Sequence, residues 1–420
     1  MRISSDIRFF RQPIDETNIE EGKMKKTSLL SGIIIFLLLA VVLMTLMTAC
    51  PTGPTEAQTL KIGAINSITG PLSASFKTVL DSAKPTQDLL NQRGGVTVND
   101  QQYNIEIIVE DDKSSPPDAV AAANILIQDG VKFMVDPVFP PNVIAMGPVC
   151  EEAKVIRFSG YQIDPTLFGP DNRYHFDTVM SLYQIAPYYD YLVSNYPQVK
   201  RVALIPPDDP GMNFATDFAI QEAQKHGLEV VFTERFAPDT QDFYPILTKA
   251  LAQEPDVING IGGLVFWGSG IINQSRELGF TGPIMFPTGT GDTNLLNSML
   301  KPEYAYDILN GLPDTNSDQM LPLIKEFRPL VEQTGTEFIF DSTLVLASVS
   351  VMLQGIERAQ SLDTEQVLAA LESMESFDTP WGKATWGGEE LGGLNHMGKN
   401  ENVPMTRIVN GQVQFEWLKP

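Results

Sequence analysis

Short apolar runs alternate with polar turns and amphipathic stretches through most of the chain beyond residue 58. The first run, Leu60–Asn66, is apolar at most consecutive positions, which is typical of a strand buried on both faces. The Ser, Thr, Gly and Pro residues at 67–71 then end the strand in a turn that presents backbone N–H groups and hydroxyls. We interpret Leu60 as the start of the first strand of an α/β domain, and the turn as the first wall of a ligand cleft.

The same succession of strand, turn and helix continues in two halves. We expect further strands at Tyr103–Glu110, Val131–Val135, Val155–Ser159, Val199–Ile205, Glu229–Arg235, Val257–Ile261, Pro283–Phe286 and Tyr306–Leu309. Helical patterns occupy Ser73–Gln92 with a break near Pro85, Ser115–Gly130, Asn142–Ala153, Leu182–Asn195, Phe214–His226, Leu321–Gln333, Asp341–Ala359 and Thr364–Met374. Units this short, with strands of continuous apolar character, predict parallel sheets with helices on both faces. The fold class is therefore α/β, with two doubly wound lobes.

One helix and one hairpin give the clearest local signals. Phe243, Ile246, Leu247, Ala250 and Leu251 fall on one buried helical stripe. In the tail, Ala384–Trp386 and Val413–Trp417 have strand patterns, and Asn410-Gly411 is typical of a tight hairpin turn.

In doubly wound sheets the ligand lies against the loops at the carboxyl ends of the strands. The candidate wall segments are Ser67–Phe76, Asp136–Asn142 and Ser159–Asp164 in the first lobe, and Pro206–Met212, Gly262–Gly270 and Pro287–Asp292 in the second.

The amino-terminal 58 residues have the composition of a targeting signal followed by a tether. Lys23, Lys25 and Lys26 precede the apolar run Leu29–Leu46, and Met47–Cys50 follows it. A basic start, an apolar run and small residues before a break are the parts of a secretory signal, although 18 residues also approach the length of a membrane span. Residues 51–58 are unable to pack a core. Residues 1–22 do not fit the signal, so Met24 is an alternative start.

Charge and cysteine content exclude several classes of function. The chain has 52 Asp+Glu against 29 Lys+Arg, a net charge of −23, which argues against binding nucleic acid or anionic lipid. Its two cysteines, Cys50 and Cys150, provide no disulfide framework, and we expect Cys150 to be a small buried apolar residue. His175, His226 and His396 are scattered without metal-ligand spacing. The glycines at 260–270 never form G-x-G-x-x-G, so we expect neither a metal nor a cofactor.

Several polar and aromatic residues have two interpretations. Asp111 and Asp112 can coordinate a cation or shape the turn into the next helix, and the turn is the simpler interpretation. Asp208 and Asp209 can bind a ligand amine or form a solvent-exposed turn. Phe266 and Trp267 can offer a stacking surface or belong to the core.

From Leu60 to about Leu312 the order of motifs resembles the type I periplasmic substrate-binding proteins of branched-chain amino acid ABC importers. The matching pieces are Ile62-Gly63 with Thr69-Gly70-Pro71, residues 91–95 (NQRGG), 110–112 (EDD), 118–123 (DAVAAA), 242–248 (DFYPILT) and 275–279 (SRELG). Met47–Cys50 resembles the lipobox of bacterial lipoproteins, with Met where Leu is usual, so Cys50 is the expected lipidation site. The resemblance implies two lobes, three hinge crossings near Phe176–Val179, Asn310–Asp314 and Phe377–Thr379, and a small ligand trapped by lobe closure.

The positions that grip an amino acid in that family differ here. Pro140 and Gln162 stand where a Ser and a Thr hold the ligand's α-carboxylate and α-ammonium, Thr288 replaces an acid, and Pro210 replaces an aromatic residue. A zwitterion would leave charges unpaired in a closed cleft, at a cost of roughly several kcal/mol per charge. Phe139, Tyr161, Phe266 and Trp267 instead put aromatic surface on these loops, so we expect an apolar or aromatic solute. The candidate ligand-binding residues are Ser67, Phe76, Phe139, Asn142, Tyr161, Gln162, Asp209, Trp267 and Thr288.

These expectations define the domains: a signal peptide at 1–49, a lipid-anchored tether at 50–58, a first lobe from 59–178 and 312–377, and a second from 179–311 and 378–420. We expect a monomeric, non-enzymatic solute-binding protein, extracytoplasmic and anchored to the membrane by its lipid, that delivers its ligand to ABC importer permease subunits. A sensor lobe that signals to a membrane partner is the alternative, disfavoured by the absence of a second apolar membrane segment up to Pro420. An extracytoplasmic hydrolase is a third, but no nucleophile–base pair is visible at any sequence spacing.

Overall fold

The computed structural model describes residues 57–178, 182–208 and 210–419, which belong to one compact unit beginning at Ala57. The predicted signal peptide, the lipobox with Cys50 and nearly all of the tether lie outside the described residues. Within the described residues, no helix combines the length and apolar composition needed to cross a membrane.

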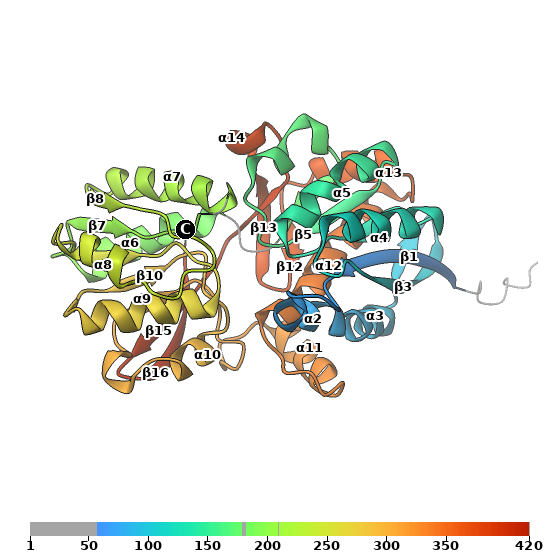
Figure 1. Ribbon diagram of the computed structural model, residues 1–420. Helices are drawn as coiled ribbons and strands as arrows, with labels where there is room; N and C mark the ends of the chain where they lie inside the picture. Colours follow the sequence, from blue (N-terminus) through green and yellow to red (C-terminus); the bar gives the residue numbers. More distant parts are fainter. Residues whose placement is uncertain (1–56, 179–181, 209, 420) are drawn as a thin grey trace, which may run out of the picture. The chain divides into compact units, whose positions relative to one another are not determined.

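Two mixed sheets, dominated by parallel strands, form the framework, which confirms the predicted α/β class (Figure 1). We call the nine-stranded sheet and its helices lobe 1, and the seven-stranded sheet and its helices lobe 2. In spatial order, the strands of lobe 1 are β12 (Phe377–Thr379), β13 (Gly382–Gly387), β14 (Met397–Asn400), β6 (His175–Asp177), β5 (Ile156–Ser159), β4 (Phe133–Val135), β1 (Gln58–Asn66), β3 (Gln101–Asp111) and β2 (Val96–Val98). Those of lobe 2 are β16 (Gln412–Leu418), β15 (Val403–Val409), β11 (Ile308–Asn310), β10 (Ile284–Phe286), β9 (Val257–Asn259), β7 (Arg201–Leu204) and β8 (Glu229–Thr233).

Helices cover both faces of each sheet. In lobe 1 they are α2 (Ser73–Asp81), α3 (Ala83–Gln92), α4 (Pro116–Gln128), α5 (Pro140–Glu152), α11 (Pro322–Glu332), α12 (Leu344–Ala359), α13 (Thr364–Glu372) and α14 (Glu389–Gly392). In lobe 2 they are α6 (Ile185–Asn195), α7 (Pro210–Lys225), α8 (Tyr244–Leu251), α9 (Val265–Glu277) and α10 (Thr293–Ser298).

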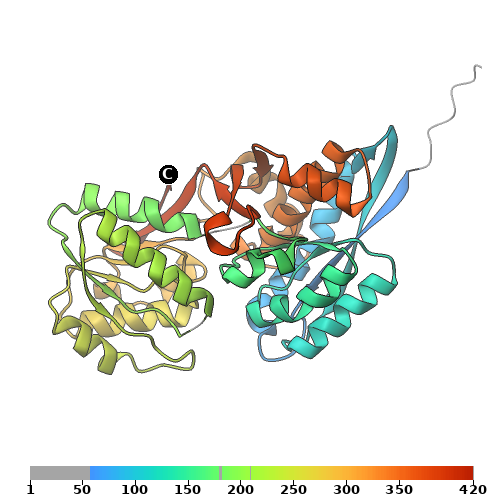
Figure 2. The same cartoon turned by 90° about the horizontal axis from the view of Figure 1, so that it is seen from above.

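The apolar core follows these layers. One cluster joins β1 and β4 to α4 and α5, which lie side by side in Figure 2, and another packs the opposite face against α3, α11, α12 and α13. In lobe 2, α6 and α7 cover one face and α8, α9 and α10 the other. The predicted stripe on α8 is largely confirmed: Phe243, Ile246, Leu247 and Ala250 are buried, and Leu251 is half-buried. The continuous apolar runs of the sequence therefore reflect strands covered on both sides.

Two local predictions are refined by the geometry. The expected break in Ser73–Gln92 exists, but it falls at Ser82, between α2 and α3, and Pro85 lies in the first turn of α3. Proline is tolerated there because the first turn's N–H groups have no helical partner. Asn410 (φ 52°) and Gly411 (φ 74°) form the predicted tight turn between β15 and β16.

The chain passes between the two sheets after β6, after β11 and between β14 and β15. The prediction of a third crossing at Phe377–Thr379 is wrong, and so is the assignment of residues 378–400 to lobe 2. Phe377 pairs with Ala384 in an antiparallel ribbon, and Met397 of β14 pairs with Asp177 of β6. The ribbon extends the sheet of lobe 1, so lobe 1 continues to Asn400.

Candidate functional site

The carboxyl ends of four neighbouring strands gather the predicted wall segments of lobe 1. The parallel order β5-β4-β1-β3 brings together the residues that follow Ser159, Val135, Asn66 and Asp111. The first and second wall segments and the start of the third therefore lie at one edge of one sheet.

A buried carboxylate connects three of these loops. Asp112, fully buried after β3, accepts hydrogen bonds from the hydroxyl of Ser67 (2.6 Å), the amide nitrogen of Asn142 (2.7 Å) and the backbone N–H of Ser114 (2.8 Å). Ser67 and Asn142 are themselves fully buried. Sequence reasoning assigned Asp112 to a turn and missed its role as the partner of two candidate site residues. Only the proximity of three strand ends, which sequence does not show directly, reveals it.

Asp111, beside it, holds the preceding turn of the first wall segment. Its carboxylate accepts from the hydroxyl of Thr69 (2.6 Å) and from the backbone N–H groups of Ile68 (2.9 Å) and Lys113 (2.9 Å). Burial pushes the pKa of Asp111 upward, but these hydrogen bonds outweigh it and lower the pKa. The turn-forming interpretation of Asp111 agrees with these contacts.

Tyr161 occupies a strained position at the start of the third wall segment. Its φ of 69° is in the left-handed region, which is rare for a bulky residue and is often found at functional sites. Its hydroxyl donates to Asp341 Oδ1 (2.8 Å), and its ring lies 5.6 Å from that of Phe340. Burial raises the pKa of Asp341 to about 6. The nearby Asp292 carboxylate adds to this rise, and the hydrogen bond from Tyr161 opposes it. Asp341 and Asp292 were not among the predicted site residues.

Gln162, next to Tyr161, is 1% exposed, and its side-chain nitrogen donates hydrogen bonds within the protein. Nε2 donates to the carbonyl oxygens of Val138 (2.9 Å) and Gly160 (3.3 Å), while its backbone N–H donates to Asp177 Oδ2 (2.8 Å). Gln162 thus fixes the second and third wall segments against each other.

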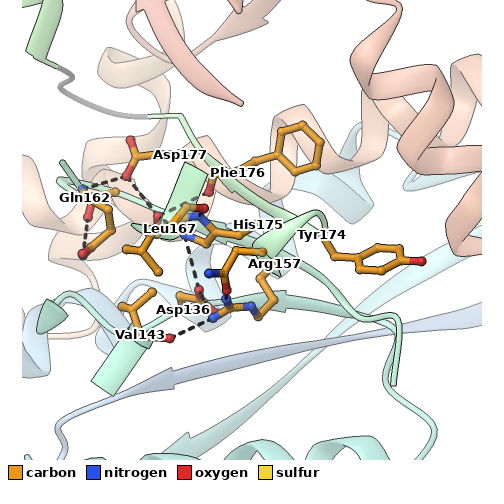
Figure 3. A network of polar contacts seen from close by, with 12 residues as sticks. Asp136, Val143, Arg157, Gln162, Leu167, Tyr174, His175, Phe176 and Asp177 are labelled. Carbon is orange, nitrogen blue, oxygen red and sulfur yellow. Dashed lines mark hydrogen bonds and ion pairs between the residues drawn. The ribbon is translucent and has the colours of Figure 1, made fainter. Parts of the chain in front are cut away.

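Beneath these loops runs a buried polar network that the sequence analysis missed (Figure 3). Arg157, on β5 and fully buried, donates to Asp136 Oδ2 (2.8 Å) and to the carbonyl oxygen of Val143 on α5 (3.2 Å). Burial raises the pKa of Asp136 to about 6 although the Arg157 guanidinium opposes the rise. Arg157 therefore links the start of the second wall segment to α5. The sequence feature that could have predicted this network is an arginine inside the apolar run Val155–Ser159.

The same network continues to β6. Burial, with the Arg157 charge, lowers the pKa of His175 well below its ordinary value, so its ring is neutral. Its Nδ1 lies 3.1 Å from the carbonyl oxygen of Leu167 and its Nε2 lies 2.9 Å from the Ser159 hydroxyl. Ser159 in turn lies 3.0 Å from the carboxylate of Asp177, which holds the backbone of Gln162.

The corresponding loops of lobe 2 are held by backbone contacts and by two buried asparagines, Asn259 and Asn310, of which Asn310 Oδ1 accepts from the N–H of Thr290 (2.9 Å). Ile261, after β9, has a φ of 64°. The N–H of Ile261 donates to Asn259 Oδ1 (2.8 Å). The carbonyl oxygen of Ile261 accepts from the N–H (2.8 Å) and the hydroxyl (3.0 Å) of Thr288. Gly263 donates to the carbonyl oxygen of Gly289 (2.7 Å). A Cβ at Gly262 would stand 2.6 Å from that same carbonyl oxygen, which explains the glycine.

Trp267, the predicted stacking residue, lies in the core of lobe 2. It is 9% exposed, its Nε1 donates to the carbonyl oxygen of Pro238 (3.1 Å), and its ring packs edge-on against Phe236 and Phe266. Phe266, by contrast, is 41% exposed at the first turn of α9. Phe266 is therefore the more accessible ring of this pair.

The remaining candidates are placed as follows. Phe76 on α2, Phe139 before α5 and Thr288 are partly exposed, whereas Asp209 and Cys50 lie outside the described residues. Cys150 is buried without a disulfide, as predicted, and burial raises its pKa to about 12.

Two hollows lie away from these loops. One of about 560 Å³ is lined by Tyr196, Asp256, Phe280 and Asp307, at the amino-terminal edge of the lobe 2 sheet. The other, about 20 Å³, lies by Tyr183, Trp381 and Asn402 near the crossings. Neither contains a predicted site residue. No cluster of three or more His, Cys, Asp or Glu placed to hold a metal occurs among the residues that the structure describes.

Comparison with known proteins places this framework among solute-binding proteins. The family model described as "Periplasmic binding protein" matches residues 59–411. A Leu/Ile/Val-binding protein of Rhizobium johnstonii is 24% identical over 353 residues, covering 82% of this chain and 91% of that protein.

Solved structures agree with the fold. A leucine-binding protein of Thermotoga maritima has a TM-score of 0.67 at 22% identity, covering 86% of this chain and 99% of that one. An ABC-transporter solute-binding protein of R. palustris in complex with 4-hydroxybenzoate has a TM-score of 0.68 at 19% identity, covering 86% and 98%.

Proposed function

Because the chain belongs to the periplasmic binding protein family, whose model matches residues 59–411, we propose that it is a lipid-anchored protein that captures an apolar or aromatic solute for an ABC importer. Its relatives include a Leu/Ile/Val-binding protein, and solved structures of the same fold include solute-binding proteins of ABC transporters. Loops of both lobes would hold the solute, which becomes enclosed as the lobes close.

One observation carries the choice of solute: the positions that grip an amino acid in the family have no free hydrogen-bond donor here. Pro140 offers no hydroxyl. The nitrogen of Gln162 is committed to two backbone carbonyls, and the hydroxyl of Thr288 donates to Ile261. An α-carboxylate would find no free donor at these positions, so leucine, isoleucine and valine should bind weakly or not at all.

The comparisons support an aromatic alternative without deciding it. The relatives named for Leu, Ile and Val are only about a quarter identical, which leaves room for a different ligand. The R. palustris neighbours were solved with 4-hydroxybenzoate and with benzoate, so related folds accommodate aromatic rings. Phe139, Tyr161 and the exposed Phe266 would provide the apolar surface, each ring pair contributing about 0.5–1.5 kcal/mol beyond burial.

Thermal-shift screening of the chain against a metabolite library, followed by calorimetry on each hit, tests this function. We expect at least one apolar or aromatic solute to raise the melting temperature and to bind at micromolar or lower concentration. If no solute binds, the chain is not a capture protein. Micromolar binding of leucine would leave the function standing and overturn the proposed ligand.

The anchor is tested separately. If Met47–Cys50 is a lipobox, mass spectrometry of the protein from its native membrane should show an acylated Cys50 at the amino terminus. Replacing Cys50 with Ala should abolish both the acylation and the cleavage. An unmodified Cys50, or an intact segment before it, would contradict the lipid anchor.

A further inference from the structure

Two side-chain amides of lobe 1 have buried oxygen atoms without a hydrogen-bond donor. Asn142 Oδ1 and Gln162 Oε1 are both unpaired, and these residues are 0% and 1% exposed. A buried acceptor left without a donor costs about 1–3 kcal/mol. The two amides lie on adjacent wall segments, because Gln162 bonds the carbonyl of Val138 and Asn142 belongs to the first turn of α5 just beyond it.

The orientation of each amide follows from its partners. A carboxylate such as Asp112 can only accept, so it must face the NH₂ group of Asn142 and leave the oxygen on the other side. The carbonyls of Val138 and Gly160 likewise can only accept, which fixes the NH₂ group of Gln162 toward them. Exchanging oxygen and nitrogen would break these bonds, so both free atoms are acceptors.

The charged side chains of the wall segments have one sign. Asp341 receives the Tyr161 hydroxyl, and the Asp292 carboxylate of lobe 2 is close enough to raise its pKa. None of the six wall segments contains Lys, Arg or His, whereas five aspartates occur in them. A carboxylate on the solute would find no cation in these segments, while a donor would find several acceptors.

We propose that the captured solute is an organic amine with an apolar or aromatic body, whose N–H groups donate to the free oxygens of Asn142 and Gln162 and to the Asp341 carboxylate. This inference rests on the proposed function and specifies the chemistry of the same site. The acceptors are held by the protein itself, so they require no rearrangement of their own partners. Phe139 and Tyr161, on the same two segments, would contact the apolar body.

Calorimetry with three probes of similar shape tests this inference on the full chain in detergent. The probes are 2-phenylethylamine, the alcohol 2-phenylethanol and the carboxylate 3-phenylpropanoate. We expect the amine to bind at least tenfold more tightly than the carboxylate, with the alcohol between them. Equal or tighter binding of the carboxylate would overturn the inference.

Two variants connect the preference to named groups. Asp341→Asn keeps an acceptor for the Tyr161 hydroxyl but removes the charge, so amine affinity should fall about tenfold or more and alcohol affinity should hardly change. Asp292→Asn, which retains a good helix cap for α10, should reduce amine affinity in the same direction. Asp129→Asn, at an exposed carboxylate outside the wall segments, is the matched control and should change nothing. Unchanged amine affinity in the folded variants would contradict the proposal.

The outcomes distinguish a failure of the amine preference from a failure of the proposed capture function. If another library solute binds while all three probes fail, or if only the carboxylate binds, the amine preference is wrong and the capture function stands. If no solute of any class binds, both are wrong.

Discussion

The loops at the carboxyl ends of the two sheets are built in different ways. In lobe 1 they are held by side chains: Asp112 with Ser67 and Asn142, Asp341 with Tyr161, and Arg157 with Asp136 beneath them. In lobe 2 they are held mainly by the backbone around Ile261, Gly263 and Gly289 and by the neutral amides of Asn259 and Asn310, over a core that contains Trp267.

Under the proposed function, this difference would give the two lobes different roles. The polar groups of lobe 1 have fixed directions and exclude groups that do not match them, which favours selection of a solute's polar end. Lobe 2 offers closely packed backbone and an exposed ring, Phe266, which suit coverage of an apolar body.

The largest expected effect comes from breaking the buried ion pair of lobe 1. Arg157→Met leaves the buried Asp136 without its ion-pair partner, so the free energy of unfolding should fall by about 3–5 kcal/mol. Denaturant titration measures it. Arg173→Met, at a largely exposed pair with Glu365, should cost at most about 1 kcal/mol. Equal losses for the two variants would show that the buried pair does not support these loops.

A second pair of variants separates core from contact surface in lobe 2. Trp267→Ala should lower the free energy of unfolding by about 3–5 kcal/mol, because it empties a buried site. Phe266→Ala should cost less than about 1 kcal/mol but weaken solute binding by about tenfold. Denaturation and calorimetry on both variants decide this. If Trp267→Ala instead weakened binding while Phe266→Ala lowered the stability, Trp267 would be the residue that contacts the solute.

The backbone contacts of lobe 2 are tested by two glycines with the same conformation. Gly289 has a φ of 85° and a Cβ there would lie 2.5 Å from Leu312, whereas Gly279 has a φ of 90° and open space. Gly279→Ala should cost about 1 kcal/mol from backbone strain alone. Gly289→Ala should cost about 1–3 kcal/mol more, since the added methyl group must displace Leu312. Identical melting curves would mean that packing around Gly289 is loose.

The smallest effect is a pH dependence in lobe 1. The pKa of Asp341 is raised from 3.8 to about 6, so the folded chain keeps a proton that the unfolded chain has released between these values. The resulting stabilisation is present below about pH 4 and is lost as the pH rises through about 6. Relative to Asp341→Asn, the wild type should therefore lose on the order of 1–2 kcal/mol between these pH values. A constant difference between the two proteins would indicate that the pKa of Asp341 is ordinary.

Sequence patterns predicted the layers of this fold well because burial on both faces leaves continuous apolar strands and striped helices. They misplaced the third crossing, since the strand pattern at Phe377–Thr379 does not tell which sheet receives the strand. They singled out Ser67, Asn142 and Gln162 by their position after strands, and the structure places all three at one edge of the lobe 1 sheet. They missed Asp341 and Arg157, whose partners Tyr161 and Asp136 are distant in the sequence, and included Asp292 only as the end of a wall segment.

The central claim is that one solute is held by loops of both lobes. Small-angle X-ray scattering of residues 57–420, with and without a saturating solute from the screen, tests it directly. The account predicts a smaller radius of gyration with the solute, because contacts to both lobes form only when the lobes close. An unchanged scattering profile, with binding confirmed by calorimetry on the same sample, would contradict it.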